Sequence, residues 1–228
     1  MKTRIEYIKE LRKRMLWAII PCLVIFIVVF LNSSFIIQTL LNYYGISVNS
    51  LTPSEGVVAR MNLGLVSALV FFIPLFLYQI IGFMGEAIPN KIKKSIKTKM
   101  AFVFILAIFG LLAGITIFSK MVLNGLIQYN IGNSVWGILS VISLVSTFGL
   151  ILALSIQTIW FIPFITKMDI ISKKTLSKSR PFLFVGLLIA SAIITPPDVI
   201  SQMLVMIPLY GSFEVGMLLT KYKEEVET

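Results

Sequence analysis

Apolar and polar residues alternate in long blocks along this chain of 228 residues. A helix of about 20 apolar residues crosses a hydrocarbon core of ~30 Å. Six apolar blocks meet or approach that length, and short polar segments separate them. The pattern therefore predicts an all-α integral membrane protein with six transmembrane helices, built as one membrane domain over residues 1–228. The predicted spans are residues 15–31, 61–83, 101–122, 136–166, 181–195 and 199–220.

The last two spans and four prolines give this bundle an expected shape. Pro21, Pro74, Pro163 and Pro208 fall inside predicted spans, where proline removes a backbone hydrogen bond and bends a helix. We therefore expect a curved bundle of proline-bent helices. The fifth span has fifteen residues, or about 22 Å of helix, which is shorter than the ~30 Å core. Short fifth and sixth spans favour local thinning of the bilayer or association with partners.

Basic residues lie almost entirely in alternate polar segments. Eighteen of the twenty lysines and arginines precede the first span, follow the last, or occupy the second and fourth connections. Of the other two, Arg60 lies in the first connection and Lys120 lies near the end of the third span, next to the third connection. Because short segments rich in Lys and Arg remain in the cytoplasm, this pattern predicts a multi-pass protein with both termini in the cytoplasm.

Composition narrows the possible chemistry. The net charge of +10 suggests nucleic-acid binding, but the basic residues flank spans, where they meet anionic lipid headgroups. We therefore expect no nucleic-acid partner. Cys22 is the only cysteine and the chain has no histidine, which excludes an internal disulfide, a Ser-His protease and histidine metal sites. No phosphate-binding GxxxxGK[ST] loop is present. We expect no enzymatic activity and no cofactor.

The polar segments carry local signals. Residues 35–44 have the apolar spacing of a short helix in the outer interface, and Gly45 follows as a stop signal. The connection from 119 to 135 also resembles surface-lying structure. Near the N-terminus, Glu10 and Arg14 are four residues apart, which is the favoured order for a helical ion pair.

Six short motifs resemble, in order, those of the TatC family, the core subunit of the twin-arginine protein translocase. The first matches the family's ELRxR element before the first span, the fifth matches its TPPDxxSQ element, and the sixth completes the last span. The motifs are Glu10–Arg14, Leu51–Glu55, Tyr78–Gln79 with Phe83, Ser179–Phe182, Thr195–Gln202, and Pro208–Tyr210 with Phe213–Gly216. Together they extend over nearly the whole chain.

The resemblance implies a subunit of the Sec-independent protein translocase in a prokaryotic cell membrane. Such a protein binds twin-arginine signal peptides at the cytoplasmic face. It organises single-span subunits of the TatA and TatB type for export of folded cargo. The resemblance also implies homo-oligomers within the translocase and a drive from the proton-motive force without a nucleotide.

By the resemblance, signal-peptide binding falls on residues at the cytoplasmic ends of the first two spans. A carboxylate suits this role because it accepts paired hydrogen bonds from a guanidinium. The family often places a second acidic residue where this chain has Ile92. Glu86 is our hypothesis for the missing carboxylate, and Glu6 is the alternative. The predicted signal-peptide residues are Glu10, Arg12, Arg14, Phe83 and Glu86.

A second predicted site contacts partner transmembrane helices. Gln157 stands where the family frequently has glutamate, and its alternative role is a hydrogen bond within the chain. Asp198 is equally suited to capping the sixth span, with Thr195 at the cap position. Gln202, one turn later, completes the predicted set with Gln157, Thr195 and Asp198. The rival function is a small secondary transporter, which would require charged residues near the membrane midplane and related halves.

Overall fold

The computed structural model describes residues 4–50, 52–83, 90–128, 136–167, 170–194 and 199–220. Within these ranges the regular elements are helices, and one isolated bridge pairs Asn49 with Gly137. The helices are α1 (Arg4–Leu31), α2 (Ser33–Tyr44), α3 (Glu55–Phe83), α4 (Asn90–Ala113), the π-helical turn η2 (Gly114–Phe118), α5 (Ser119–Gln128), α6 (Ile138–Lys167), α7 (Lys173–Lys178), α8 (Arg180–Ile194) and α9 (Val199–Leu219).

The helices confirm the predicted fold class. Five helical segments in the described ranges are long and apolar enough to cross a membrane, and α8 adds a shorter apolar helix. The third apolar stretch is longer than expected, because helix continues from Ala101 through η2 to Gln128. The four prolines lie inside α1, α3, α6 and α9, each of which continues through its proline. The bending itself stays a prediction.

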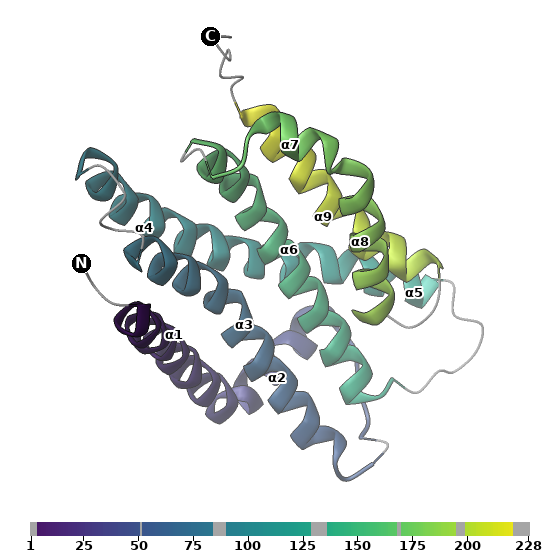
Figure 1. Ribbon diagram of the computed structural model, residues 1–228. Helices are drawn as coiled ribbons and strands as arrows, with labels where there is room; N and C mark the ends of the chain where they lie inside the picture. The colour runs from purple at the N-terminus through teal and green to yellow at the C-terminus, as the bar shows by residue number, and fades with distance from the viewer. Residues whose placement is uncertain are drawn as a thin grey trace. The chain divides into compact units, whose positions relative to one another are not determined.

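The chain forms two compact units, and their boundary falls inside α6, after Leu150. In the first unit α1 and α3 run side by side (Figure 1). Ala59 and Leu63 of α3 are buried with Ile37 of α2 and Ile142 of α6. The short helix α2 therefore contributes a side chain to the hydrophobic core of this unit.

Close backbone approach joins η2 to α6 in the first unit. A Cβ added at Gly114 would lie 2.5 Å from the carbonyl oxygen of Phe148 and 2.7 Å from Cα of Gly149. Only glycine permits this distance, because any side chain would overlap backbone atoms that have no freedom to rotate away. Nearby, Leu123 and Val145 are buried in the same region of the unit.

The connection between α1 and α3 contains the short helix that the sequence predicted, α2. Gly45 has φ 67° and its N–H donates to the carbonyl of Leu41 at 2.9 Å, which confirms the glycine stop. Beyond it, Asn49 bonds in both directions with the start of α6. Its N–H donates to the carbonyl of Trp136 at 3.0 Å, and its carbonyl accepts from Ile138 at 3.1 Å.

The second unit comprises the last part of α6 with α7, α8 and α9. Here α8 and α9 lie side by side (Figure 1). Ile162 of α6 is buried with Phe213 and Met217 of α9, and Gly216 allows α9 to approach Ile162 closely. The short helix α7 begins after Ser172, whose hydroxyl accepts from the N–H of Thr175 at 3.1 Å.

Candidate functional site

Glu10 lies on α1 with its carboxylate already bound to a guanidinium. Arg14 donates to Glu10 Oε1 from Nη2 at 2.8 Å and from Nε at 3.1 Å. The two side chains keep 29% and 30% of their surface exposed. A helical pair at this spacing and exposure contributes about 0.3–0.5 kcal/mol. The Glu10 carboxylate is therefore partly exposed, and its contact with Arg14 is by itself a weak one.

Arg12 does not join this pair. Successive residues of an α-helix are about 100° apart, so Arg12 lies about 200° round α1 from Glu10. Its side chain is exposed. The structure thus brings Glu10 and Arg14 together and leaves Arg12 on a different face of the same helix.

The remaining predicted signal-peptide residues fall at the edge of the described chain. Phe83 is the last residue of α3, and its side chain lies outside the described residues, as does Glu86 entirely. Ile92, which replaces the family's acidic residue, belongs to the first turn of α4. The second carboxylate stays a prediction.

The predicted partner-helix residues are in the second unit. Gln157 is buried on α6, with 4% of its surface exposed. Gln202 of α9 donates from Nε2 to the carbonyl of Leu188 in α8 at 2.9 Å, so its amide already serves a contact between two helices of the chain. Thr195 and Asp198 lie outside the described residues. Contact of this set with a partner helix stays a prediction.

A polar cluster that joins the start of α8 to the last part of α9 was not predicted as a site. Arg180 donates from Nη2 to Glu214 Oε2 at 2.8 Å, and the Tyr210 hydroxyl donates to Glu214 Oε1 at 3.1 Å. In the same unit, Lys173 of α7 donates to the carbonyl of Thr220, where a cation also suits the C-terminal end of a helix. Arg180 and Glu214 lie in two of the six family motifs, 34 residues apart along the chain.

A second polar cluster joins α2 to η2 in the first unit. The hydroxyls of Tyr43 and Tyr44 in α2 donate to the carbonyls of Thr116 and Ile115 in η2, at 3.2 and 2.5 Å. Burial raises the pKa of Tyr44 to about 12. The ammonium of Lys120 lies 4.4 Å from the centre of the Tyr43 ring, within the range of a cation–π contact.

Neither cluster has the composition of a metal site. In the described ranges, no group of three His, Cys, Asp or Glu side chains is placed to hold an ion. The polar groups instead accept and donate hydrogen bonds between helices, or present a carboxylate and basic side chains at a helix end.

Comparison with known proteins identifies the family. The model of the Sec-independent protein translocase protein (TatC) family matches residues 6–208. The TatC protein of Helicobacter pylori is 29% identical over 94% of this chain and 86% of its own. TatC of Escherichia coli strain K12 is 28% identical over 96% and 88%, and TatCy of Bacillus subtilis is 26% identical over 95% and 88%.

The fold agrees with the same assignment. A crystal structure described as the twin arginine translocase receptor TatC superposes with a TM-score of 0.79 at 22% identity. The superposition covers 93% of this chain and 97% of the chain in the crystal structure. Since the family model spans most of the sequence and the helical architecture matches, this membrane protein belongs to the TatC family of Sec-independent protein translocase components.

Proposed function

We propose that this chain is the signal-peptide receptor of a twin-arginine translocase. It binds the paired arginines of cargo signal peptides in the cytoplasm, and its own termini face the same side. It then organises single-span subunits of the TatA and TatB type, together with further copies of itself, for export of folded proteins. The proton-motive force drives the export, and the chain performs no catalysis.

The Glu10 carboxylate carries this proposal. It lies near the N-terminal end of α1, in the segment with six basic residues before the first span. Its contact with Arg14 is two hydrogen bonds to one carboxylate oxygen, which is the chemistry that an incoming guanidinium would use. An arginine of the signal peptide can replace Arg14, because an exposed i, i+4 pair is worth less than 1 kcal/mol.

Arg14 and Arg12 have different places in this proposal. Arg14 orients the carboxylate in the resting protein and is the group displaced on binding. Arg12 belongs to the signal-peptide site by family resemblance alone, since it lies on another face of α1. Phe83 and Glu86 are proposed from the same resemblance as the wall and the second carboxylate of the site.

The test is binding of a fluorescent signal peptide to the purified chain in detergent. Peptides with paired arginines and paired lysines are compared on the wild type and Glu10→Ala. We expect the wild type to prefer paired arginines and Glu10→Ala to bind them roughly 10- to 150-fold more weakly, which corresponds to ~1.5–3 kcal/mol. Lysine has one ammonium group and cannot form the planar paired contact.

Glu55→Gln is the matched control. Glu55 lies in the first turn of α3, which by chain direction is the end of the α1–α3 pair remote from Glu10. It should leave peptide binding within twofold of wild type. Equal binding of both peptides by wild type and Glu10→Ala would contradict the receptor proposal.

A further inference from the structure

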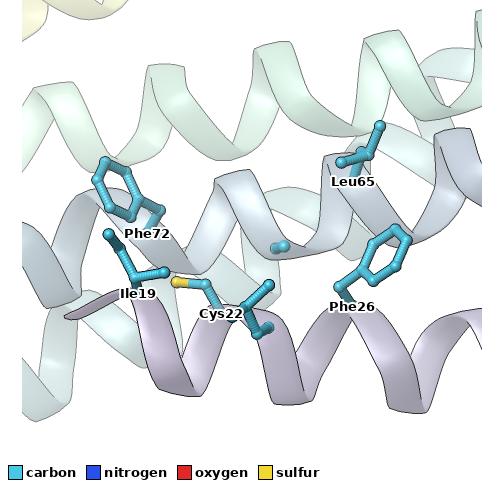
Figure 2. Close-up of a pocket in the computed structure, with 7 residues that line it drawn as sticks. Ile19, Cys22, Phe26, Leu65 and Phe72 are labelled. Atoms are coloured by element: carbon cyan, nitrogen blue, oxygen red, sulfur yellow. The ribbon is translucent and has the colours of Figure 1, made fainter. Parts of the chain in front are cut away.

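An apolar groove runs between α1 and α3 in the first unit (Figure 2). Figure 2 shows Ile19, Cys22 and Phe26 on one helix facing Leu65 and Phe72 on the other. The groove has a volume of about 220 Å³, which is below the ~300–1,000 Å³ of sites for drug-sized molecules. Its lining residues are Ile19, Cys22, Leu23, Phe26, Leu65, Ala68 and Phe72.

The lining suits a hydrocarbon chain and nothing polar. Cys22 is buried, and its thiol donates to the carbonyl of Ala18 at 3.2 Å, so it offers no polar group to a ligand. Ala68 is the smallest lining side chain and leaves room beside Cys22. Ile19 and Leu65 are 40% and 52% exposed and form the sides. The groove is therefore narrow, apolar and open towards the surrounding bilayer.

A positive charge lies in line with this groove. Arg12, Ile19, Leu23 and Phe26 are spaced by seven, four and three residues, and this spacing places them on one face of α1. Arg12 is exposed and lies about 10 Å from Ile19 along the helix. Helical side chains lean towards the N-terminus, so its guanidinium extends towards the membrane surface. Lys9, one turn earlier, is also exposed on this side.

We propose that this face of α1 binds one anionic phospholipid. Its phosphate contacts Arg12 and Lys9, and one acyl chain enters the groove. Charge complementarity selects this occupant, because the acidic neighbour Glu10 is on another face and engaged with Arg14. Arg12 is shared with the proposed signal-peptide site, whereas Lys9 and the groove belong to the lipid site alone.

The dimensions agree with a lipid of one leaflet. Arg12 begins the first membrane-spanning segment. The hydrocarbon of a single leaflet is about 15 Å thick, or about ten residues of helix. An acyl chain that starts beside Arg12 therefore reaches the level of Cys22, at the centre of the groove.

Native mass spectrometry of the purified chain tests the charged half of the site. The chain is titrated with phosphatidylglycerol and with phosphatidylcholine of the same acyl chains. One basic side chain near a headgroup changes lipid affinity about fivefold. We expect Arg12→Gln to weaken phosphatidylglycerol binding about fivefold, without change for phosphatidylcholine, and Arg12→Lys to retain most of it. Lys178→Gln removes the same charge at an exposed position of α7, in the other unit, and should change binding less than twofold.

Filling the groove tests the apolar half. Ala68→Phe should weaken binding of both lipids at least fivefold, because the ring occupies the space of the acyl chain. Ala192→Phe adds the same ring at an exposed position of α8 and should have no effect. If Ala68→Phe lowers the thermal stability of the chain, Ala68→Leu is the milder filling and should still weaken both lipids.

Two outcomes would overturn the proposal. Equal effects of Arg12→Gln and Lys178→Gln would mean that the general positive charge of the chain attracts lipid without a site. Unchanged lipid binding by Ala68→Phe and Ala68→Leu would mean that no acyl chain uses the groove. Loss of a co-purified single-span subunit in those two variants would then assign it to a protein helix. Signal-peptide binding, measured on Ala68→Phe and Ala68→Leu, reports separately on the proposed receptor function, because Ala68 is not among the proposed signal-peptide residues.

Discussion

Two polar contacts between helices, one from each compact unit, differ in chemistry; we call them the neutral and the charged connection. In the first unit, phenol hydroxyls of α2 donate to backbone carbonyls of η2. In the second, Arg180 of α8 is paired with Glu214 of α9, and their side chains are 42% and 31% exposed. A neutral hydrogen bond is insensitive to salt, whereas an exposed ion pair is screened and is worth about 0–1 kcal/mol. We therefore expect the neutral connection to contribute more to the free energy of unfolding, and the charged connection mainly to orient α8 and α9.

The largest expected effect is at the close approach that holds η2 in place. Gly114→Ala places a Cβ 2.5 Å from the carbonyl oxygen of Phe148, and backbone must move to accept it. We expect a loss of about 3 kcal/mol in the free energy of unfolding, at the upper end for overpacking. Thermal unfolding in detergent measures this effect.

Gly125→Ala is its control, because a Cβ there meets nothing within 4 Å. It should be neutral or stabilising by up to about 1 kcal/mol, since alanine favours helix. Equal unfolding temperatures for the two variants would show that η2 does not depend on this approach.

Removing one phenol hydroxyl tests the neutral connection itself. Tyr44→Phe takes a donor from the Ile115 carbonyl, and we expect a loss of about 1–2 kcal/mol. Tyr43→Phe should cost less than about 1 kcal/mol, because Tyr43 is exposed and water can replace its hydroxyl. The two variants are compared by the same thermal unfolding. A larger effect at Tyr43 would contradict this account.

The neutral connection also has a predicted pH dependence. The pKa of Tyr44 is raised by burial from 10.0 to about 12, so the folded chain retains this proton longer than the unfolded chain. Its contribution to stability is complete below pH 10 and is lost as the pH rises towards 12. The unfolding temperature of the wild type should therefore fall more steeply over this window than that of Tyr44→Phe. Parallel curves would exclude Tyr44 as the titrating group.

The smallest expected effect is in the charged connection. Glu214→Gln should lower stability by no more than about 1 kcal/mol at low salt. In 1 M salt, where the Debye length is about 3 Å, the difference from wild type should disappear. Unfolding temperatures at 50 mM and 1 M NaCl provide the measurement. A salt-independent loss above about 2 kcal/mol would place this pair alongside the neutral connection and remove the contrast between the units.

Local and periodic features of the fold were predictable from sequence. Blocks of apolar residues gave the spans, Gly45 gave the end of α2, and four-residue spacing gave the Glu10–Arg14 pair. Each depends on residues within a few turns of one another. The motif order also pointed to the family that the comparisons identify.

Features that depend on distant residues were not predictable. The π-helical turn at Gly114 depends on the path of α6, and the Arg180–Glu214 pair depends on how α8 meets α9. Gln202 stays a predicted contact for a partner helix, and a polar residue in a span takes a hydrogen-bonding partner. Sequence does not reveal that the carbonyl of Leu188 is already close enough to provide one.

The hydrogen bond from Tyr44 to Ile115 has a consequence for biosynthesis. These residues are 71 positions apart, and chains are synthesised at about 5–20 residues per second. Roughly 4–14 seconds therefore pass between the synthesis of Tyr44 in α2 and the synthesis of Ile115, whose carbonyl accepts its hydrogen bond. During that interval Tyr43 and Tyr44 lack the carbonyls to which they donate in the folded protein. The membrane insertion machinery therefore encounters α2 before the residues that it packs against have been synthesised.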